Sequence, residues 1–202
     1  EEIDKNIIKK LKLYNVSQGK KICELGNLPG GVIFIISGKV RVITVSDKKF
    51  PHTIKIYEKN SILGADIILR GVADQIISAS TNVSYFLIET NDFLELVDKY
   101  ESFHKQFLYV DSPELLSIIN QTKSPSLPDI KDLIKYSNNV CNKKKLKAVV
   151  CKTYDKAIFR NRKNYFVSSN NLRNKPPGSI IKSDDEFLIQ GKLPVRLIPI
   201  PK

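Results

Sequence analysis

The fold of this chain is indicated by the stretch Val32-Ile33-Phe34-Ile35-Ile36-Ser37-Gly38-Lys39-Val40-Arg41-Val42. β-Branched and aromatic residues fill both ends of it, as they do in strands, and the Ser-Gly-Lys in the middle is typical of a turn. Because side chains alternate along a strand, we expect Phe34 and Ile36 on one face and Ile33 and Ile35 on the other. The stretch therefore predicts two strands joined at hairpin distance, with a positive φ at Gly38.

The residues around this stretch continue the pattern. Seven of the nine glycines fall between Gly19 and Gly71, among short apolar runs that extend from Tyr14 to Ile88. Runs of this length, separated by glycine, predict a compact antiparallel β unit. Apolar residues at helical spacing occur on both sides of it, within residues 1–13 and residues 92–107. We therefore expect an antiparallel β unit with flanking helices.

The second half of the chain has a different composition. Ser112-Pro113-Glu114 predicts a helix start with Ser112 as N-cap, and residues 122–128 are rich in Ser and Pro, as linkers are. After them come a short helical pattern near residue 130 and strand-like pieces at 146–151, 165–168, 187–189 and 195–200. The expected fold class is α+β, with a first domain at 1–121, a linker at 122–128 and a small α+β module at 129–202.

The composition favours a soluble domain of the cytoplasm. The chain has 202 residues and 42% apolar content, enough for a packed core, and no apolar run approaches the roughly 18 residues that cross a bilayer. Three cysteines at unrelated spacings argue against a disulfide scaffold and for a reducing compartment, and with only two histidines no metal site is expected. The chain lacks Met and opens on Glu, so we expect a piece of a longer protein.

The net charge of +12 is unevenly distributed along the chain. Residues 143–175 contain eleven basic residues and one acid, Asp155, and aromatic residues lie between them. Such a stretch attracts nucleic acid or anionic lipid. A run of charge is more often a solvated face, and lysine is abundant along the whole chain. We therefore expect a solvated face on the second module and no nucleic-acid partner.

A frame of glycines and strand residues covers residues 16–64. Val16, Gly19, Ile22 and Gly26 precede the opening stretch, and Ile62-Leu63-Gly64 follows it. In order and spacing this frame resembles the cyclic-nucleotide-binding domain family, which includes the catabolite activator protein and the regulatory subunits of protein kinase A. The resemblance covers about residues 1 to 110. It implies an antiparallel β-roll with flanking helices, a regulatory or sensory role, a cyclic nucleotide as candidate ligand and a homodimer as candidate assembly.

The same resemblance places a phosphate-binding cassette after Gly64. In the family a Gly-Glu pair leads into a short helix whose N–H groups face the cyclic phosphate, the Glu holds the ribose hydroxyl, and an Arg about nine residues later pairs with the phosphate. Here Gly64 matches, but Ala65 occupies the Glu position. The Arg position falls on Ala73, or on Asp74 if no gap is allowed. The resemblance therefore implies a degenerate cassette.

Two nearby residues leave alternatives open. Asp66 could replace the missing Glu through a shift of one residue, and Arg70 could reach the phosphate from the turn. If neither residue takes over these roles, we expect the cassette to bind cyclic AMP or cyclic GMP weakly or not at all. The candidate ligand-binding residues of the cassette are Gly64, Ala65, Asp66, Arg70, Ala73 and Asp74.

Four shorter motifs narrow the resemblance. They look like parts of the amino-terminal region of cyanobacterial ABC-type toxin or bacteriocin exporters. The motifs are Ile68-Leu69-Arg70-Gly71, Ala79-Ser80-Thr81, Tyr165-Phe166-Val167-Ser168-Ser169 and the stretch from Gly191 to Pro199. This implies a regulatory domain whose partners are the membrane and ATPase domains of an exporter. One alternative is a transcriptional regulator of the catabolite-activator type, whose helix-turn-helix is not visible after Pro128. Another is a structural assembly domain without a ligand.

Motifs for catalysis are missing from the sequence. The three Gly-Lys pairs, at Gly19, Gly38 and Gly191, are followed by Lys, Val and Leu, whereas a P-loop needs Ser or Thr there. Cys141 and Cys151 lie among lysines without a nearby His to act as base. We therefore expect no enzymatic activity in this chain, and an ATPase only elsewhere in a full-length exporter.

The uneven charge predicts weak binding of this chain to DNA. If the basic residues of 143–175 form only a solvated face, their attraction to phosphates is electrostatic and is screened over about 8 Å at physiological ionic strength. A gel shift on bulk DNA should show binding at low salt that vanishes near physiological salt. Sequence-selective binding that persists at physiological salt would instead support the transcriptional regulator.

Overall fold

The computed structural model describes residues 5–45, 50–122, 129–153, 164–182 and 185–200. The chain forms two compact units, residues 1–68 with 73–105, and residues 69–72 with 106–202. This division differs from the boundaries predicted from the sequence. The residues from 106 to 121, expected in the first domain, belong to the second unit, because hydrogen bonds and an ion pair join them to Arg196 near the end of the chain.

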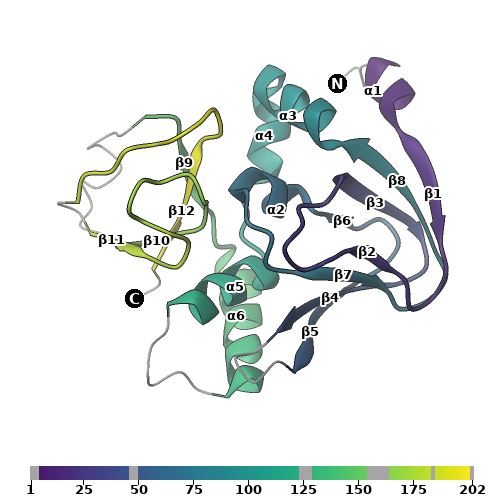
Figure 1. Cartoon of the computed structure of the whole chain (residues 1–202), viewed down its shortest axis with the longest axis horizontal. Helices are drawn as coiled ribbons and strands as arrows, with labels where there is room; N and C mark the ends of the chain where they lie inside the picture. Colours follow the sequence, from purple (N-terminus) through teal and green to yellow (C-terminus); the bar gives the residue numbers. More distant parts are fainter. Residues whose placement is uncertain (1–4, 46–49, 123–128, 154–163, 183–184, 201–202) are drawn as a thin grey trace. The chain divides into compact units, whose positions relative to one another are not determined.

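The first unit consists mainly of strands (Figure 1). Its elements are α1 (Lys5–Lys10), β1 (Lys12–Val16), β2 (Lys21–Cys23), β3 (Gly31–Ser37), β4 (Val40–Val45), β5 (Pro51–Tyr57), β6 (Ile62–Leu63), α2 (Ala65–Arg70), β7 (Ile76–Ala79), β8 (Val83–Glu89), α3 (Thr90–Lys99) and α4 (Glu101–Gln106). They form two antiparallel four-stranded sheets with the strand orders β1-β8-β3-β6 and β2-β7-β4-β5. The last residues of α2 are grouped with the second unit.

One buried cluster of the first unit lies on the face of β3 that carries Ile33 and Ile35, but the predicted alternation holds only in part, because Val32, on the opposite face, is 0% exposed. Ile33 and Ile35 are 1% and 3% exposed, whereas Phe34 is only half-buried. Val40 and Ile77 from the other sheet belong to the same buried cluster. Burial of both sheets' apolar faces in one cluster is the main stabilisation that this unit has available.

The predicted hairpin is not formed. β3 pairs with β8 and β6, and β4 pairs with β5 and β7, so Gly38 carries the chain from one sheet to the other. Gly38 has the expected positive φ, +85°. The turn is held by residues 80 and 81: Lys39 N–H donates to Thr81 Oγ1, and Ser80 N–H donates to the Lys39 carbonyl. Loop length alone does not distinguish a hairpin from such a crossing.

A helix follows the β unit as predicted, but the helical pattern of residues 92–107 is divided into α3 and α4 at Tyr100, which has an extended backbone. α3 begins at Thr90, two residues before the expected start, and buries Phe93, Leu96 and Val97. The rings of Phe93 and Phe103 meet edge to face with centroids 6.1 Å apart. The contact connects α3 with α4.

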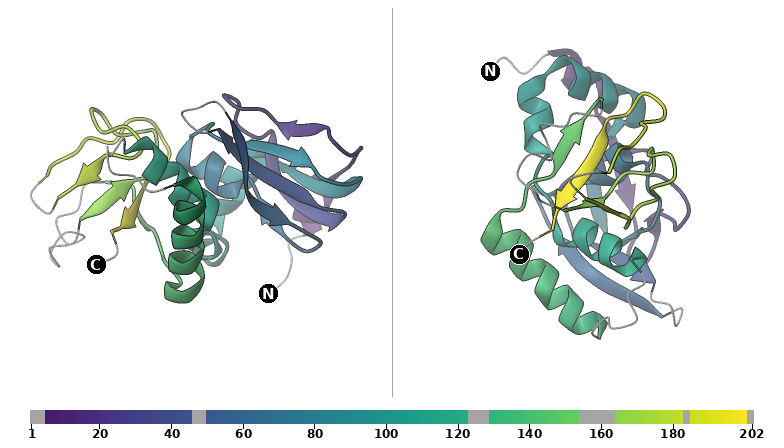
Figure 2. Two further views of the ribbon diagram at one scale, coloured as in Figure 1. Left: turned by 90° about the horizontal axis from the view of Figure 1, so that it is seen from below. Right: turned by 90° about the vertical axis from the view of Figure 1, so that its left-hand side faces the viewer.

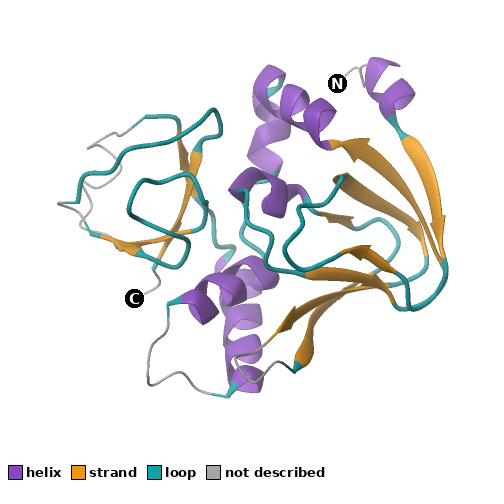
Figure 3. Cartoon of the chain, viewed as in Figure 1, coloured by secondary structure: helices purple, strands orange, loops and turns teal. Residues whose placement is uncertain are grey.

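The second unit combines two helices with a small sheet (Figure 3). Its elements are α5 (Ser112–Gln121), α6 (Ile130–Lys144), β9 (Val149–Cys151), β10 (Tyr165–Val167), β11 (Ile180–Ile181) and β12 (Val195–Pro199). The strand order is β11-β10-β12-β9, all antiparallel, and Figure 2 shows β9 and β12 side by side in opposite directions. The predicted strand at 187–189 is reduced to one bridge, between Leu172 and Ile189.

The predicted fold class is confirmed: the chain is α+β, with an antiparallel β-roll, flanking helices and a further small α+β unit. The predicted helix near residue 130 is longer than expected, since it continues to Lys144. Asp129 caps its start by accepting the Lys131 N–H. Within the residues that the structure describes, none of the helices has the length and apolar character that crossing a membrane requires.

Gly38→Val should destabilise the first unit. A Cβ at this position would lie 2.2 Å from the Asn82 carbonyl oxygen and 3.0 Å from the Val83 Cα, and the positive φ is strained for any L side chain. We expect the free energy of unfolding, measured by urea denaturation, to fall by about 1 to 3 kcal/mol. Gly30→Val is the matched control, because Gly30 has open space around it and no positive φ. Equal stabilities of the two variants would contradict the assigned turn.

Candidate functional site

The cassette predicted from the sequence lies between β6 and β7. Gly64 follows β6 with φ +90°, and a Cβ there would approach the Gly31 carbonyl oxygen to 3.2 Å. The Ile68 N–H donates to the Gly64 carbonyl, which closes the first turn of α2. After the helix, the Ala73 carbonyl accepts the Gly26 N–H. The loop and the first turn of α2 are therefore fixed by backbone hydrogen bonds within the first unit.

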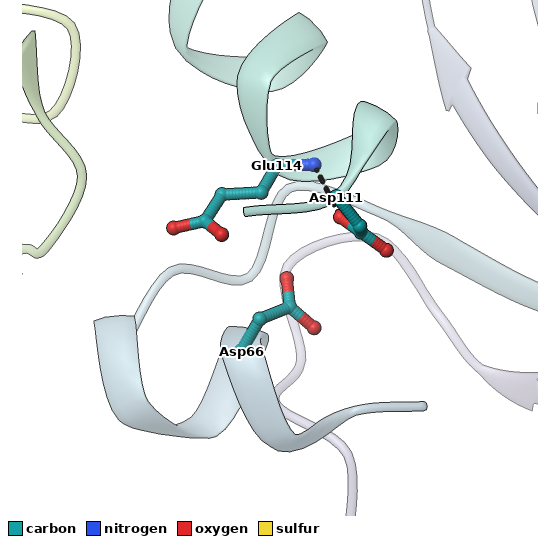
Figure 4. A group of neighbouring side chains, drawn as sticks. All are labelled: Asp66, Asp111 and Glu114. Carbon is teal, nitrogen blue, oxygen red and sulfur yellow. Dashed lines mark hydrogen bonds between the residues drawn. The ribbon is translucent and has the colours of Figure 1, made fainter. Parts of the chain in front are cut away.

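Five of the six predicted cassette residues belong to this unit. Ala65 is buried, so its small side chain is packed into the protein. Asp66, which projects from the first turn of α2 (Figure 4), is half-buried, as are Ala73 and Asp74. Neither alanine supplies the carboxylate or guanidinium that the family resemblance calls for at its position.

Arg70, the sixth predicted residue, lies in a different environment. It is grouped with the second unit, it is 1% exposed, and its Nε lies 4.0 Å from Oε1 of Glu114. Its carbonyl oxygen accepts the N–H of Asn170 at 2.8 Å. Arg70 is therefore engaged by a carboxylate of the chain itself.

Glu114 is the centre of a buried cluster of charges. Its side chain is fully buried, and Arg196 binds it through two hydrogen bonds, Nε to Oε1 at 2.6 Å and an Nη atom to Oε2 at 3.0 Å. Ser168 Oγ donates to Oε1 at 2.8 Å. This two-point contact between a guanidinium and a carboxylate is among the strongest side-chain pairings that proteins form.

Arg196 also binds the backbone of the second unit. Its Nη atoms donate to the carbonyl oxygens of Phe107 and Tyr109, at 2.6 and 3.2 Å. Its backbone N–H donates to Ser169 Oγ, and its carbonyl accepts the Ser168 N–H. One residue of β12 thus fixes the segment before α5, the first turn of α5 and the end of β10.

The first turn of α5 positions Glu114. Asp111 is the N-cap: its Oδ1 accepts the Glu114 N–H at 3.0 Å (Figure 4). The sequence had placed the cap one residue later, at Ser112. The Glu114 carboxylate points away from Asp111 in Figure 4, so its amide serves the cap and its carboxylate serves the arginines.

Burial alone would raise the pKa of Glu114, because it penalises the charged form. The attraction and hydrogen bonds of Arg196, the charge of Arg70 and the Ser168 hydrogen bond outweigh this effect and hold the pKa of Glu114 below its usual value of 4.5. A lowered pKa in the folded state stabilises the fold above the unfolded-state pKa, and this stabilisation is lost as the pH falls through the folded-state value. Glu114 is therefore ionised at neutral pH, and its lowered pKa makes the carboxylate a weak base.

The charged cluster combines residues that the sequence had singled out for another reason. Arg70, Ser168 and Arg196 come from three of the four motifs that resemble the exporter region, and each faces the same carboxylate. The fourth motif, Ala79-Ser80-Thr81, holds the turn at Gly38. Glu114 itself was assigned only to a helix start. The sequence feature that could have indicated a buried carboxylate is Arg196 within an apolar run, because a buried arginine needs a carboxylate partner.

Comparisons with known proteins concern the fold. No family model matches the chain, and no curated protein matches it. It is similar to the regulatory subunit of a cAMP-independent protein kinase A from Trypanosoma brucei (18% identity, TM-score 0.45, covering 52% of this chain and 40% of that one). It is also similar to a cyclic nucleotide-binding domain from Methylobacillus flagellatus (16%, 0.45, 51% and 58%) and to the sensor domain of the transcriptional regulator DNR from Pseudomonas aeruginosa (14%, 0.47, 60% and 82%).

These matched proteins are distant, and the chain spans about half the length of the first two. With TM-scores below 0.5 and identities below 20%, the similarities assign neither a ligand nor a partner to this chain.

Glu114→Gln should destabilise the second unit strongly. The change keeps the size of the side chain but leaves two buried guanidinium groups without their carboxylate, which costs about 3 to 5 kcal/mol when a buried pair is broken. Urea denaturation at neutral pH measures this loss, and Glu186→Gln, at an exposed position, is the control. The difference from the unmodified chain should shrink as the pH falls from the unfolded-state pKa of 4.5 toward the lower folded-state pKa of Glu114, because the unfolded chain takes up the proton first. A loss no larger than that of the control would show that the cluster contributes little.

Proposed function

We propose that this chain is a non-enzymatic regulatory domain of the cyclic-nucleotide-binding type whose nucleotide pocket has been lost, and that it serves an ABC-type exporter of a toxin or peptide. The observation that carries the first part is the pairing of Arg70 with Glu114. Arg70 was the one residue near the cassette that could have replaced the missing phosphate-binding arginine.

The electrostatics at Arg70 support a lost pocket. A phosphate would have to compete with a carboxylate that is already held at ion-pair distance in a fully buried site. Withdrawing Arg70 would also leave Glu114 with less compensation for its own desolvation. With Ala65 and Ala73 at the other two positions, what remains for a phosphate is the backbone of a six-residue helix, whose dipole contributes about 0.3 to 2 kcal/mol toward an anion.

The exporter context rests on the four sequence motifs that resemble the exporter region. Three of them supply partners of Glu114 and the fourth holds the turn at Gly38, so the motifs are residues that maintain this fold. In this proposal the domain lies in the cytoplasm and acts by contact with the membrane and ATPase domains of the exporter. A reading frame that continues after Lys202 into membrane spans and a P-loop would support it, and a helix-turn-helix there would contradict it.

The transcriptional regulator is the second candidate, and its DNA-reading element is the discriminating feature. Such a regulator needs two helices joined by a turn of three or four residues. Within the described residues of the second unit, α5 and α6 are separated by residues 122–129, and strands β9 to β12 follow α6. Within these described residues the arrangement is not a helix-turn-helix, so the regulator would need its DNA-reading element elsewhere in the protein.

The lost pocket predicts poor nucleotide binding. A buried phosphate without its charged partner costs about 3 to 5 kcal/mol. At about 1.4 kcal/mol per tenfold, roughly two to three and a half decades of affinity should therefore be missing. Isothermal titration calorimetry with cyclic AMP and cyclic GMP should show no binding at micromolar concentrations. Ala73→Arg, which restores a cation at the family position, should raise the affinity at least tenfold.

A micromolar dissociation constant for either nucleotide in the unmodified chain would contradict this proposal. If that binding were abolished by Arg70→Lys in a variant that keeps its melting temperature, Arg70 would be the substituted phosphate ligand. The lysine retains the charge for Glu114 but not the guanidinium geometry, so it separates phosphate recognition from the stability of the buried cluster.

A further inference from the structure

The two units differ sharply in charge. The first unit contains 14 basic and 13 acidic residues, and the second contains 19 basic and 8 acidic residues. The excess of positive charge therefore belongs almost entirely to the second unit. Glu114 is buried there, so it neutralises Arg70 and Arg196 and none of the surface.

Four exposed lysines at the end of α6 form the densest part of this charge. Lys143, Lys144, Lys145 and Lys147, here called the lysine cluster, are all solvent-exposed. Across the part of the chain that the structure describes, none of them lies within ion-pair distance of a carboxylate. Several lysines of the first unit do have such partners: Lys10 with Asp92 and Glu95, Lys12 with Glu89, Lys21 with Glu24, and Lys39 with Glu58.

Helix stability does not account for the whole cluster. Lysines in the last turn are favourable to the helix dipole, which explains Lys143 and Lys144. Lys145, however, is the C-cap and has a left-handed backbone with φ 45° and ψ 55°. Glycine is the residue that adopts this conformation without strain. A lysine at this position adds repulsion within the cluster and strain in the backbone.

An aromatic side chain adjoins the cluster. Tyr109 is 51% exposed, and Lys147 Nζ lies 4.8 Å from the centre of its ring. Tyrosine and lysine together are typical of surfaces at the level of lipid headgroups, where the ring is partly apolar and the amine meets phosphate. The cluster contains no arginine, which is the residue preferred for two-point recognition of individual phosphates in nucleic acid.

We propose that the lysine cluster with Tyr109 is a docking surface for the anionic face of a lipid membrane. Lysine ammonium groups on long, flexible side chains can follow headgroups that move within the membrane plane. The attraction comes from the opposite charges of the lysines and the anionic lipids. Leu133, Val140 and Cys141 of α6 are buried in the second unit and Ile134 is half-buried, which leaves Tyr136 as an exposed aromatic residue of the helix. Docking is therefore electrostatic and involves no insertion of the helix. This surface is independent of the exporter proposal.

Sedimentation with lipid vesicles tests the surface in the whole chain. The chain should bind vesicles made of equal parts phosphatidylcholine and phosphatidylglycerol, should bind pure phosphatidylcholine much less, and should be released by salt. A triple variant, Lys143→Gln, Lys144→Gln and Lys147→Gln, should lose affinity about fivefold per lysine and thus about a hundredfold in all. The matched control is Lys9→Gln, Lys20→Gln and Lys59→Gln, which removes three exposed charges from the first unit.

Lys145→Gly separates binding from folding. The glycine relieves the left-handed backbone, so the melting temperature should stay the same or rise, while vesicle affinity should fall about fivefold. Equal binding by the triple variant and its control would overturn the proposal, because net charge alone would then explain the attraction. Preferential binding of the chain to single-stranded DNA over the anionic vesicles at physiological salt would also overturn the proposal, because it would assign the surface to nucleic acid.

Discussion

The second unit depends on one buried carboxylate. Glu114 is completely removed from solvent, and such a charge is tolerated only when other charges and hydrogen-bond donors compensate it fully. Arg196 supplies two hydrogen bonds, Ser168 one, and Arg70 a further positive charge. Each of these partners lies far from Glu114 in sequence, so satisfying one side chain brings together α5, the end of β10, β12 and the segment around Arg70.

This requirement explains why the unit boundary is not where the linker is. The Ser- and Pro-rich residues 122–128 separate α5 from α6 in sequence, but α5 carries Glu114 and therefore belongs with β12. A buried ion pair is a weak source of net stability, since desolvation offsets much of the attraction. What it provides is specificity: an arrangement that moves either arginine away leaves a charge buried without compensation. The same constraint removes Arg70 from the residues that could bind a phosphate.

The sequence predicted the parts of the fold that depend on local pattern. The burial of Ile33 and Ile35, the positive φ of Gly38 and the helix that buries Phe93 follow from alternation, steric freedom and helical spacing. The pairing partners of β3 and β4 did not follow, because a turn of three residues is compatible with a hairpin or with a change of sheet. The charged cluster could not be predicted for a similar reason. Glu114 and Arg196 are far apart in sequence, and a local pattern does not indicate which buried charges are in contact.

The most direct test of this account is the NMR signal of the Arg70 side-chain Nε–H group in the presence and absence of cyclic AMP. The account predicts a resonance protected from exchange with solvent, unmoved by the nucleotide and displaced by Glu114→Gln, because the guanidinium is buried against that carboxylate. A resonance that exchanges rapidly, shifts on addition of cyclic AMP and is indifferent to Glu114→Gln would show that Arg70 faces a working nucleotide pocket.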